Sequence, residues 1–197
     1  MLHPSVILDY WLGTRDEVMP DAARVVRWFV ADGQVDQEIR EQFESVVGEA
    51  LAGGLQPWEA DPRDRIALVL LVDQFPRNLY RNHPRGFSGD PRAIDLTRRS
   101  TEAELRSLHP LEQYFLLIPW MHAEDLDDQR AGEAAYALAA ESAPSAFRPL
   151  FENGRNFAAS HRKVIERFGR FPHRNAILGR ESTPEELAFL ETYGTGF

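Results

Sequence analysis

Several prolines in this chain directly follow a residue that can cap a helix, and these pairs predict where helices begin. Asp61-Pro62, Asp90-Pro91 and Thr183-Pro184 are the clearest pairs, and His109-Pro110 marks a further start. An Asp or Thr side chain accepts hydrogen bonds from the unpaired N–H groups of the first turn, and proline is tolerated at the first helical position. The chain is therefore expected to fold as a series of helices with proline-marked starts.

Apolar residues recur at spacings of three and four between these signals, as on the buried face of a helix. The helices predicted in this way cover residues 5–12, 36–52, 62–74, 90–99, 111–118, 126–143, 145–168 and 184–190. The stretch Ile66–Val72 is apolar on all sides, which predicts a central buried helix, and Pro76 is expected to end it. Gly154 is a possible kink in the long helix, and Asp125 or Asp127 is the expected cap of the alanine-rich one.

No alternating strand pattern and no Asn-Gly or Asp-Gly hairpin turn occurs in the sequence. The prediction is an all-α fold of seven to eight helices, with residues 1–197 forming one domain.

Composition limits the classes of function. Acidic residues outnumber basic ones by 31 to 22, which argues against nucleic acid as a general partner. The longest apolar run, Ile66–Val72, is too short to cross a bilayer, so no membrane partner is expected. Cysteine is absent, which fits a cytoplasmic location, and Met1–Pro4 does not start a signal peptide.

One short element occurs twice, nearly a hundred residues apart. Residues 74–78 read Gln-Phe-Pro-Arg-Asn, and residues 170–175 read Arg-Phe-Pro-His-Arg-Asn. We expect both phenyl rings to be buried and the two elements to lie side by side, forming one polar site. The ligand-binding residues predicted from these elements are Arg77, Asn78, Arg81, Arg170, Arg174 and Asn175.

The basic residues around the second element allow two interpretations. Residues 155–180 contain seven Arg or Lys and one acidic residue, Glu166, for a local net charge of +6 in a chain of net charge −9. In the first interpretation the arginines form structural ion pairs with Glu181, Glu185, Glu186 or other carboxylates. In the second they line a pocket for a carboxylate or phosphate, which a guanidinium can bind through two hydrogen bonds.

Histidines accompany these arginines. His122 and His173 are candidates for acid–base catalysis with Glu124, because imidazole exchanges protons near neutral pH. His161 and Asp125 join the predicted ligand-binding set. No spacing places two metal ligands on one helical face, so neither a metal nor another cofactor is predicted.

Three segments resemble the bacterial family known as domain of unknown function 924. They are residues 71–81 (LVDQFPRNLYR), 118–126 (IPWMHAEDL) and 167–180 (RFGRFPHRNAILGR), and residues 6–11 and 182–186 also fit. The resemblance implies an all-helical, tetratricopeptide-like array of helix pairs, and it implies no activity. One departure is Ala123, where this family is expected to carry serine, so any chemistry of that serine would be lost here.

Three functions remain open at this point. The preferred hypothesis is a binding protein that holds a small anion or a peptide carboxylate in a concave pocket lined by Arg and His. The second is a hydrolase or transferase acting on an anionic small molecule, with histidine as the acid or base. In the third, the motifs only lock the helices together in a protein-interaction module. The sequence carries no signal for an oligomeric state.

Overall fold

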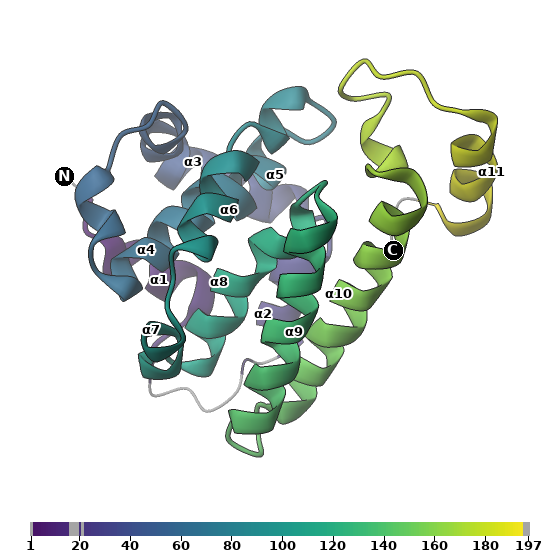
Figure 1. Ribbon diagram of the computed structural model, residues 1–197. Helices are drawn as coiled ribbons and strands as arrows, with labels where there is room; N and C mark the ends of the chain where they lie inside the picture. Colours follow the sequence, from purple (N-terminus) through teal and green to yellow (C-terminus); the bar gives the residue numbers. More distant parts are fainter. Residues whose placement is uncertain (1, 16–19, 21, 195–197) are drawn as a thin grey trace. The chain divides into compact units, whose positions relative to one another are not determined.

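The computed structural model describes residues 2–15, 20 and 22–194, and over these residues the chain is all-α without a β-strand (Figure 1). The chain divides into two compact units. The first comprises residues 1–81 and 85–119, and the second comprises residues 82–84 and 120–197. That residues 1–197 act as one domain, and that the helices form a tetratricopeptide-like array, both stay predictions.

The first unit contains the helices from the N-terminus to most of α8. They are α1 (Pro4–Leu12), α2 (Ala22–Phe29), α3 (Gly33–Leu51), α4 (Pro62–Val69), α5 (Phe75–Leu79), α6 (Asp90–Arg98), α7 (Glu102–Ser107) and α8 (Pro110–His122), whose last three residues belong to the second unit. The described residues thus form more α-helices than the seven to eight expected, because the sequence patterns did not identify α2, α5 and α7 as separate helices.

Aromatic side chains fill the core of the first unit. Phe75 is fully buried, with its ring centroid 5.3 Å from those of both Trp11 and Phe43. Trp28 packs on Phe115 at 4.8 Å and donates its indole N–H to the carbonyl of Trp11 at 2.8 Å. Each such ring removes a large apolar surface from water, and edge-to-face packing adds a further stabilisation.

Pro76 does not end the central helix, which corrects the prediction from sequence. The chain continues from α4 through a π-helical segment, Leu70–Gln74, directly into α5. The N–H of Phe75 bonds to the carbonyl of Leu70, five residues back, and Pro76 occupies the first turn of α5, where a missing N–H is tolerated. The wider π turn therefore accommodates the proline that an unbroken α-helix would reject.

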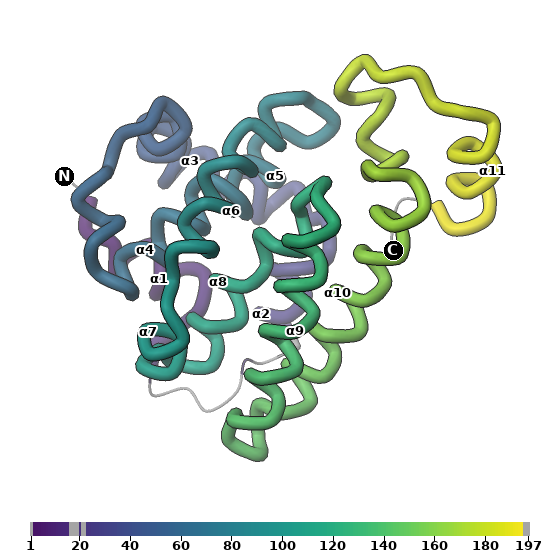
Figure 2. The backbone as a smooth tube through the Cα atoms, in the orientation of Figure 1, coloured from purple at the N-terminus to yellow at the C-terminus, as the bar shows by residue number. Residues whose placement is uncertain are grey.

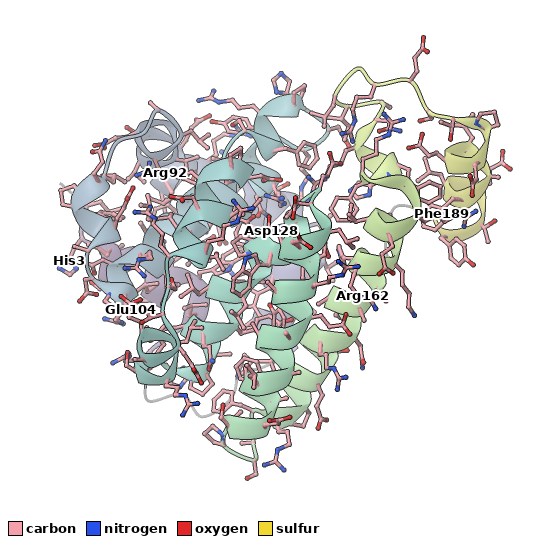
Figure 3. The ribbon with its side chains drawn as sticks, in the orientation of Figure 1. His3, Arg92, Glu104, Asp128, Arg162 and Phe189 are labelled. Carbon is pink, nitrogen blue, oxygen red and sulfur yellow. The ribbon has the colours of Figure 1, made fainter. Side chains whose placement is uncertain are left out.

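The second unit is built on two long helices, α9 (Leu126–Ser142) and α10 (Arg148–Phe168), which pack against each other along their lengths (Figure 1). Asp125 caps α9, accepting from the N–H groups of Asp127 and Asp128 at 3.0 Å each. Arg162 extends from α10 and donates to Glu133 of α9 at 2.6 Å (Figure 3). The helix α10 is continuous through Gly154, and a kink there stays a prediction.

A loop leads from α10 to the last helix, α11 (Pro184–Tyr193), and includes a short 3₁₀ turn at Pro172–Arg174 (Figure 2). Gly169 starts this loop at φ 68°, a left-handed conformation that glycine adopts without strain. Thr183 and Glu186 form the predicted capping box of α11. Phe189 of α11 packs on Phe168 with ring centroids 5.1 Å apart (Figure 3).

Other predicted boundaries are close to the observed ones. Asp61 caps α4, accepting from the N–H groups of Arg63 and Asp64, as expected. Asp90 also begins a helix, as the first residue of α6 after the N-cap Gly89, and its carboxylate accepts from Arg77 at 3.1 Å. Among the described residues, no helix is long and apolar enough to cross a membrane.

Candidate functional site

Both Phe-Pro elements bury their phenyl rings, as predicted. Phe75 in the first unit and Phe171 in the second are each 0% exposed. Each ring stabilises its unit by about 1.5–3 kcal/mol of transfer free energy. The residues that follow the two rings are therefore held at the edges of packed cores, where their polar groups have defined positions.

In the first element, Arg77 lies between two carboxylates. Its Nη1 is 3.2 Å from Asp73 Oδ1 and 3.0 Å from Asp90 Oδ1, and its Nη2 donates to Asp90 Oδ2 at 3.1 Å. Burial alone would lower the pKa of Arg77, but attraction to Asp73 and Asp90 outweighs it and raises the pKa above its usual value. Arg77 thus already has anionic partners within the first unit.

Asn78 and Arg81 share a single acid, Asp36 of α3. The Asn78 amide donates to Asp36 Oδ1 at 2.9 Å, and Arg81 binds both carboxylate oxygens, with Nη2 2.7 Å from Oδ1. These bonds tie α5 to the first turn of α3. An external anion would have to displace Asp36 to reach Arg81.

The second element has the same arrangement around Glu186, which is 2% exposed. Arg170 binds both oxygens of Glu186 at 2.7 and 2.9 Å, and Asn175 donates to Oε2 at 3.2 Å and to Ser182 Oγ at 3.1 Å. The guanidinium of Arg170 is the main cause that holds the pKa of Glu186 down at about 2. Arg170 and Asn175 therefore fasten the loop after α10 to the start of α11, as the structural interpretation of the basic cluster proposes.

Glu124 and Arg180 hold the peptide groups on both sides of Phe171. The carboxylate of Glu124 accepts the Phe171 N–H at 2.8 Å, and Arg180 binds both of its oxygens at 2.6 and 2.9 Å. Arg180 also donates to the Phe171 carbonyl at 3.2 Å. The pKa of Glu124 is lowered, since these hydrogen bonds outweigh the effect of its burial. We call this arrangement the Phe171 clamp.

Arg174 packs on the ring that the clamp fixes. Its guanidinium carbon is 4.6 Å from the centroid of Phe171, within the range of a cation–π contact. Its Nη2 donates to the main-chain carbonyl of His122 at 3.1 Å, and the residue is 6% exposed. The buried ring and the end of α8 therefore set the direction of the Arg174 fork.

Two imidazoles flank the same ring. The His161 ring is edge-on to Phe171 at 5.6 Å, and the His173 ring is tilted on it at the same centroid distance. Burial is the main cause that lowers the pKa of each histidine to about 4, and the positive charge of Arg174 adds to it. His122 also lowers both pKa values, which places it within electrostatic range. We call His122, His161, His173 and Arg174 the His/Arg cluster.

The structure thus distributes the predicted site residues between the two units. Arg77, Asn78 and Arg81 belong to the first unit, and the remaining candidates belong to the second. Within the second unit, the His/Arg cluster and Glu124 come together around Phe171, whereas Asp125 is occupied in capping α9. That the two Phe-Pro elements form one site stays a prediction.

Three residues that organise these contacts were not among the predicted site residues. They are Arg180, Glu186 and Asp36. Arg180 stands within the basic segment, and Glu186 had been named as a structural ion-pair partner, so the sequence held a signal for both. Asp36 lies 45 residues before Arg81, and no local pattern links the two. Among the described residues, no group of three or more His, Asp or Glu is arranged to hold a metal ion.

The protein is thus an all-α protein with a histidine–arginine cluster around a buried phenylalanine. The sequence profile of the bacterial proteins of unknown function called DUF924 matches residues 7–194, and the chain belongs to this family. It is similar to a solved protein of unknown function from Agrobacterium tumefaciens, with 33% sequence identity and a TM-score of 0.76. That similarity covers 96% of this chain and 97% of the other. No functionally curated protein matches.

Proposed function

We propose that the His/Arg cluster binds a small anion or the carboxylate of a peptide. The observation that carries this proposal is the position of Arg174, whose guanidinium carbon is 4.6 Å from the centroid of the buried Phe171 ring, which the imidazoles of His161 and His173 also contact. A guanidinium fork fits a carboxylate or phosphate through two parallel hydrogen bonds. Neutral imidazoles supply further hydrogen bonds without adding charge.

The other predicted arginines support this proposal less. Arg77, Arg81 and Arg170 bind carboxylates of their own units. An anion could reach them only by displacing those acids, which would leave a desolvated carboxylate behind at a cost of several kcal/mol. These arginines fit the structural interpretation, so the binding proposal rests on Arg174 and the histidines.

The lowered pKa values favour binding over acid–base catalysis. An efficient general acid or base has a pKa near the working pH, so that both protonation states are populated. His161 and His173, with pKa values of about 4, are almost entirely neutral at pH 7. A hydrolase or transferase that relied on His173 as a proton donor would therefore work poorly at neutral pH.

For the location of this activity we propose the cytoplasm, which the absence of cysteine supports.

Thermal unfolding in the presence of inorganic phosphate, acetate and succinate tests the proposal. An anion at ten times its Kd stabilises the folded protein by about 1.4 kcal/mol, which raises the melting temperature by roughly 3–6 °C in a protein of this size. Arg174→Lys keeps the charge but loses the planar fork, so the anion-dependent shift should fall by at least half.

Arg130→Lys is the matched control, because Arg130 lies on α9 of the same unit with 58% of its side chain exposed. It should shift with anions as the wild type does. Circular dichroism without anion establishes that both variants are folded. If none of the three anions shifts the wild type, or if Arg174→Lys responds equally, the proposal is wrong and the cluster is structural.

A further inference from the structure

We infer that a hollow between α9 and α10 binds a short peptide with both ends unblocked, its terminal carboxylate meeting arginine and its terminal ammonium group meeting glutamate. The hollow lies in the second unit and shares no residue with the His/Arg cluster, so this site is additional to the proposed anion site.

The hollow has a volume of about 680 Å³, within the range of roughly 300–1,000 Å³ that is common for small-ligand sites. It is lined by the last turns of α9 and the first turns of α10, two helices that pack against each other (Figure 1). Its polar lining residues are Glu141, Arg148, Glu152, Arg155 and Asn156. We call it the α9–α10 hollow.

Two alanines of α9 explain why space is left between these side chains. Farther along α10, Arg162 donates to Glu133 of α9 at 2.6 Å, so an ion pair joins the two helices there. At the hollow, α9 instead presents Ala137 and Ala140, which fill little space and carry no charge to pair with an arginine. Methyl groups and charged side chains therefore line the same hollow, as in a site that holds a small molecule.

The four charged side chains of the hollow have no ion-pair partner in the part of the chain that the structure describes. They are Glu141, Arg148, Glu152 and Arg155. Glu152 lies four residues after Arg148 and three before Arg155, spacings at which opposite charges on a helix can pair. All four side chains are exposed. Their guanidinium and carboxylate groups are thus open to a ligand.

Charges of both signs in one hollow indicate the ligand class. A small anion would be repelled by the two glutamates while the two arginines attract it, and a small cation would experience the reverse. A molecule with a carboxylate at one end and an ammonium group at the other can meet both kinds of charge. A zwitterionic ligand is therefore favoured over a simple anion or cation.

The spacing of the arginines indicates the length of this ligand. Arg148 and Arg155 are seven residues apart, so they lie two turns apart on one face of α10, about 10 Å along its axis. An extended peptide covers about 3.3–3.6 Å per residue, so three residues span this length. A tripeptide with unblocked ends is the simplest molecule that fits both the charges and the spacing.

Each contact at this site is expected to be weak, because the charged groups are exposed. An exposed ion pair changes Kd by at most about fivefold. Binding should therefore be in the millimolar range, and blocking either end of the peptide should weaken it by about two- to fivefold.

Proton–nitrogen-15 correlation spectra measure such weak binding and locate it in the chain. The probes are triglycine, its N-acetyl form and its C-terminal amide, which differ in the charge at one end. Triglycine should cause saturable shifts of main-chain amides within residues 137–156, and each blocked form should bind at least about twofold more weakly.

Two double variants separate the two ends of the ligand. Arg148→Gln with Arg155→Gln should lose the preference for triglycine over its amide and keep the preference over the N-acetyl form. Glu141→Gln with Glu152→Gln should lose the second preference and keep the first. Circular dichroism establishes that both variants are folded, which the exposure of all four residues favours.

The matched control is Arg130→Gln with Lys163→Gln, which removes two exposed cations of α9 and α10 outside the hollow. Its preferences should equal those of the wild type. The inference is overturned if triglycine shifts only other residues or none, if the blocked forms bind as tightly as triglycine, or if a double variant keeps the preference it should lose. None of these outcomes affects the proposed anion site, which the Arg174→Lys variant tests separately.

Discussion

The Phe171 clamp predicts a strong energetic coupling between Glu124 and Arg180. The two side chains are joined at 2.6 and 2.9 Å, and each is 25% exposed. Exposed ion pairs contribute about 0–1 kcal/mol, and breaking a fully buried pair costs about 3–5 kcal/mol. A pair that is three-quarters buried should lie between these limits, so we expect Glu124→Gln to lower the free energy of unfolding by about 2 kcal/mol.

This loss corresponds to a fall of roughly 4–8 °C in the melting temperature of a protein of this size. The glutamine can still accept the Phe171 N–H through its amide oxygen. The loss therefore reports the charge pairing with Arg180 rather than the hydrogen bond to Phe171. Arg180→Gln should lose a similar amount, and the double variant should lose little more than either single one.

The assay is a double-mutant cycle by urea denaturation, followed by circular dichroism. We expect a coupling free energy of about 1–2 kcal/mol between Glu124 and Arg180. The control cycle uses Asp127 and Arg130 of α9, an ion pair at 3.4 Å whose side chains are 93% and 58% exposed. Its coupling should stay below about 0.5 kcal/mol. If the two cycles give equal couplings, partial burial does not strengthen the Glu124–Arg180 pair, and the reasoning is refuted.

Three further substitutions test the charge of the second unit and the packing of the first. Arg170 and its other partners hold the pKa of Glu186 at about 2, against an ordinary value of 4.5, so Glu186 stabilises the fold above pH 4.5 and loses this effect as the pH falls toward 2. Urea denaturation between pH 7 and pH 3 should therefore show a weaker acid destabilisation in Glu186→Gln than in the wild type. A Cβ on Gly89 would lie 2.0 Å from the carbonyl oxygen of Val72, so Gly89→Ala should lose more than about 3 kcal/mol. Gly33→Ala, where a Cβ meets nothing within 4 Å, should instead gain up to about 1 kcal/mol, as measured by the same denaturation.

The structural features that could be predicted from the sequence are those that depend on residues close together in the chain. The caps by Asp61, Asp125 and Thr183 were all predictable, because a capping side chain bonds to N–H groups two or three residues ahead. Burial of the Phe75 and Phe171 rings was expected from the repeated Phe-Pro element, which is also a pattern of adjacent residues. A local rule failed at one place, Pro76, where a π turn accommodated the residue that usually stops a helix.

Contacts between residues that are far apart in the sequence were harder to predict. The basic segment contained both Arg174 and Arg180, but its charge alone did not show that Arg180 would bind Glu124, 56 residues earlier. The protonation of His161 depends on a carbonyl within its own helix, and the sequence does not show which side chains turn back to their own backbone. The elements of the candidate site were therefore predictable from sequence, whereas the carboxylates that Arg77, Arg81 and Arg170 bind became known only from the structure.

The repeated Phe-Pro element now has a physical explanation for one of its residues. Asn78 donates to Asp36 and Asn175 donates to Glu186, and in each case an arginine binds both oxygens of the same carboxylate. The asparagine therefore has the same role in both copies: its side-chain amide donates a hydrogen bond to a carboxylate that joins two helical segments. An asparagine in this role is poorly suited to bind a ligand, because its side-chain amide already donates to a carboxylate of the protein. In the second copy of the Phe-Pro element, Arg174 is the residue whose guanidinium packs on the buried Phe171 ring. The binding hypothesis depends on Arg174 for that reason.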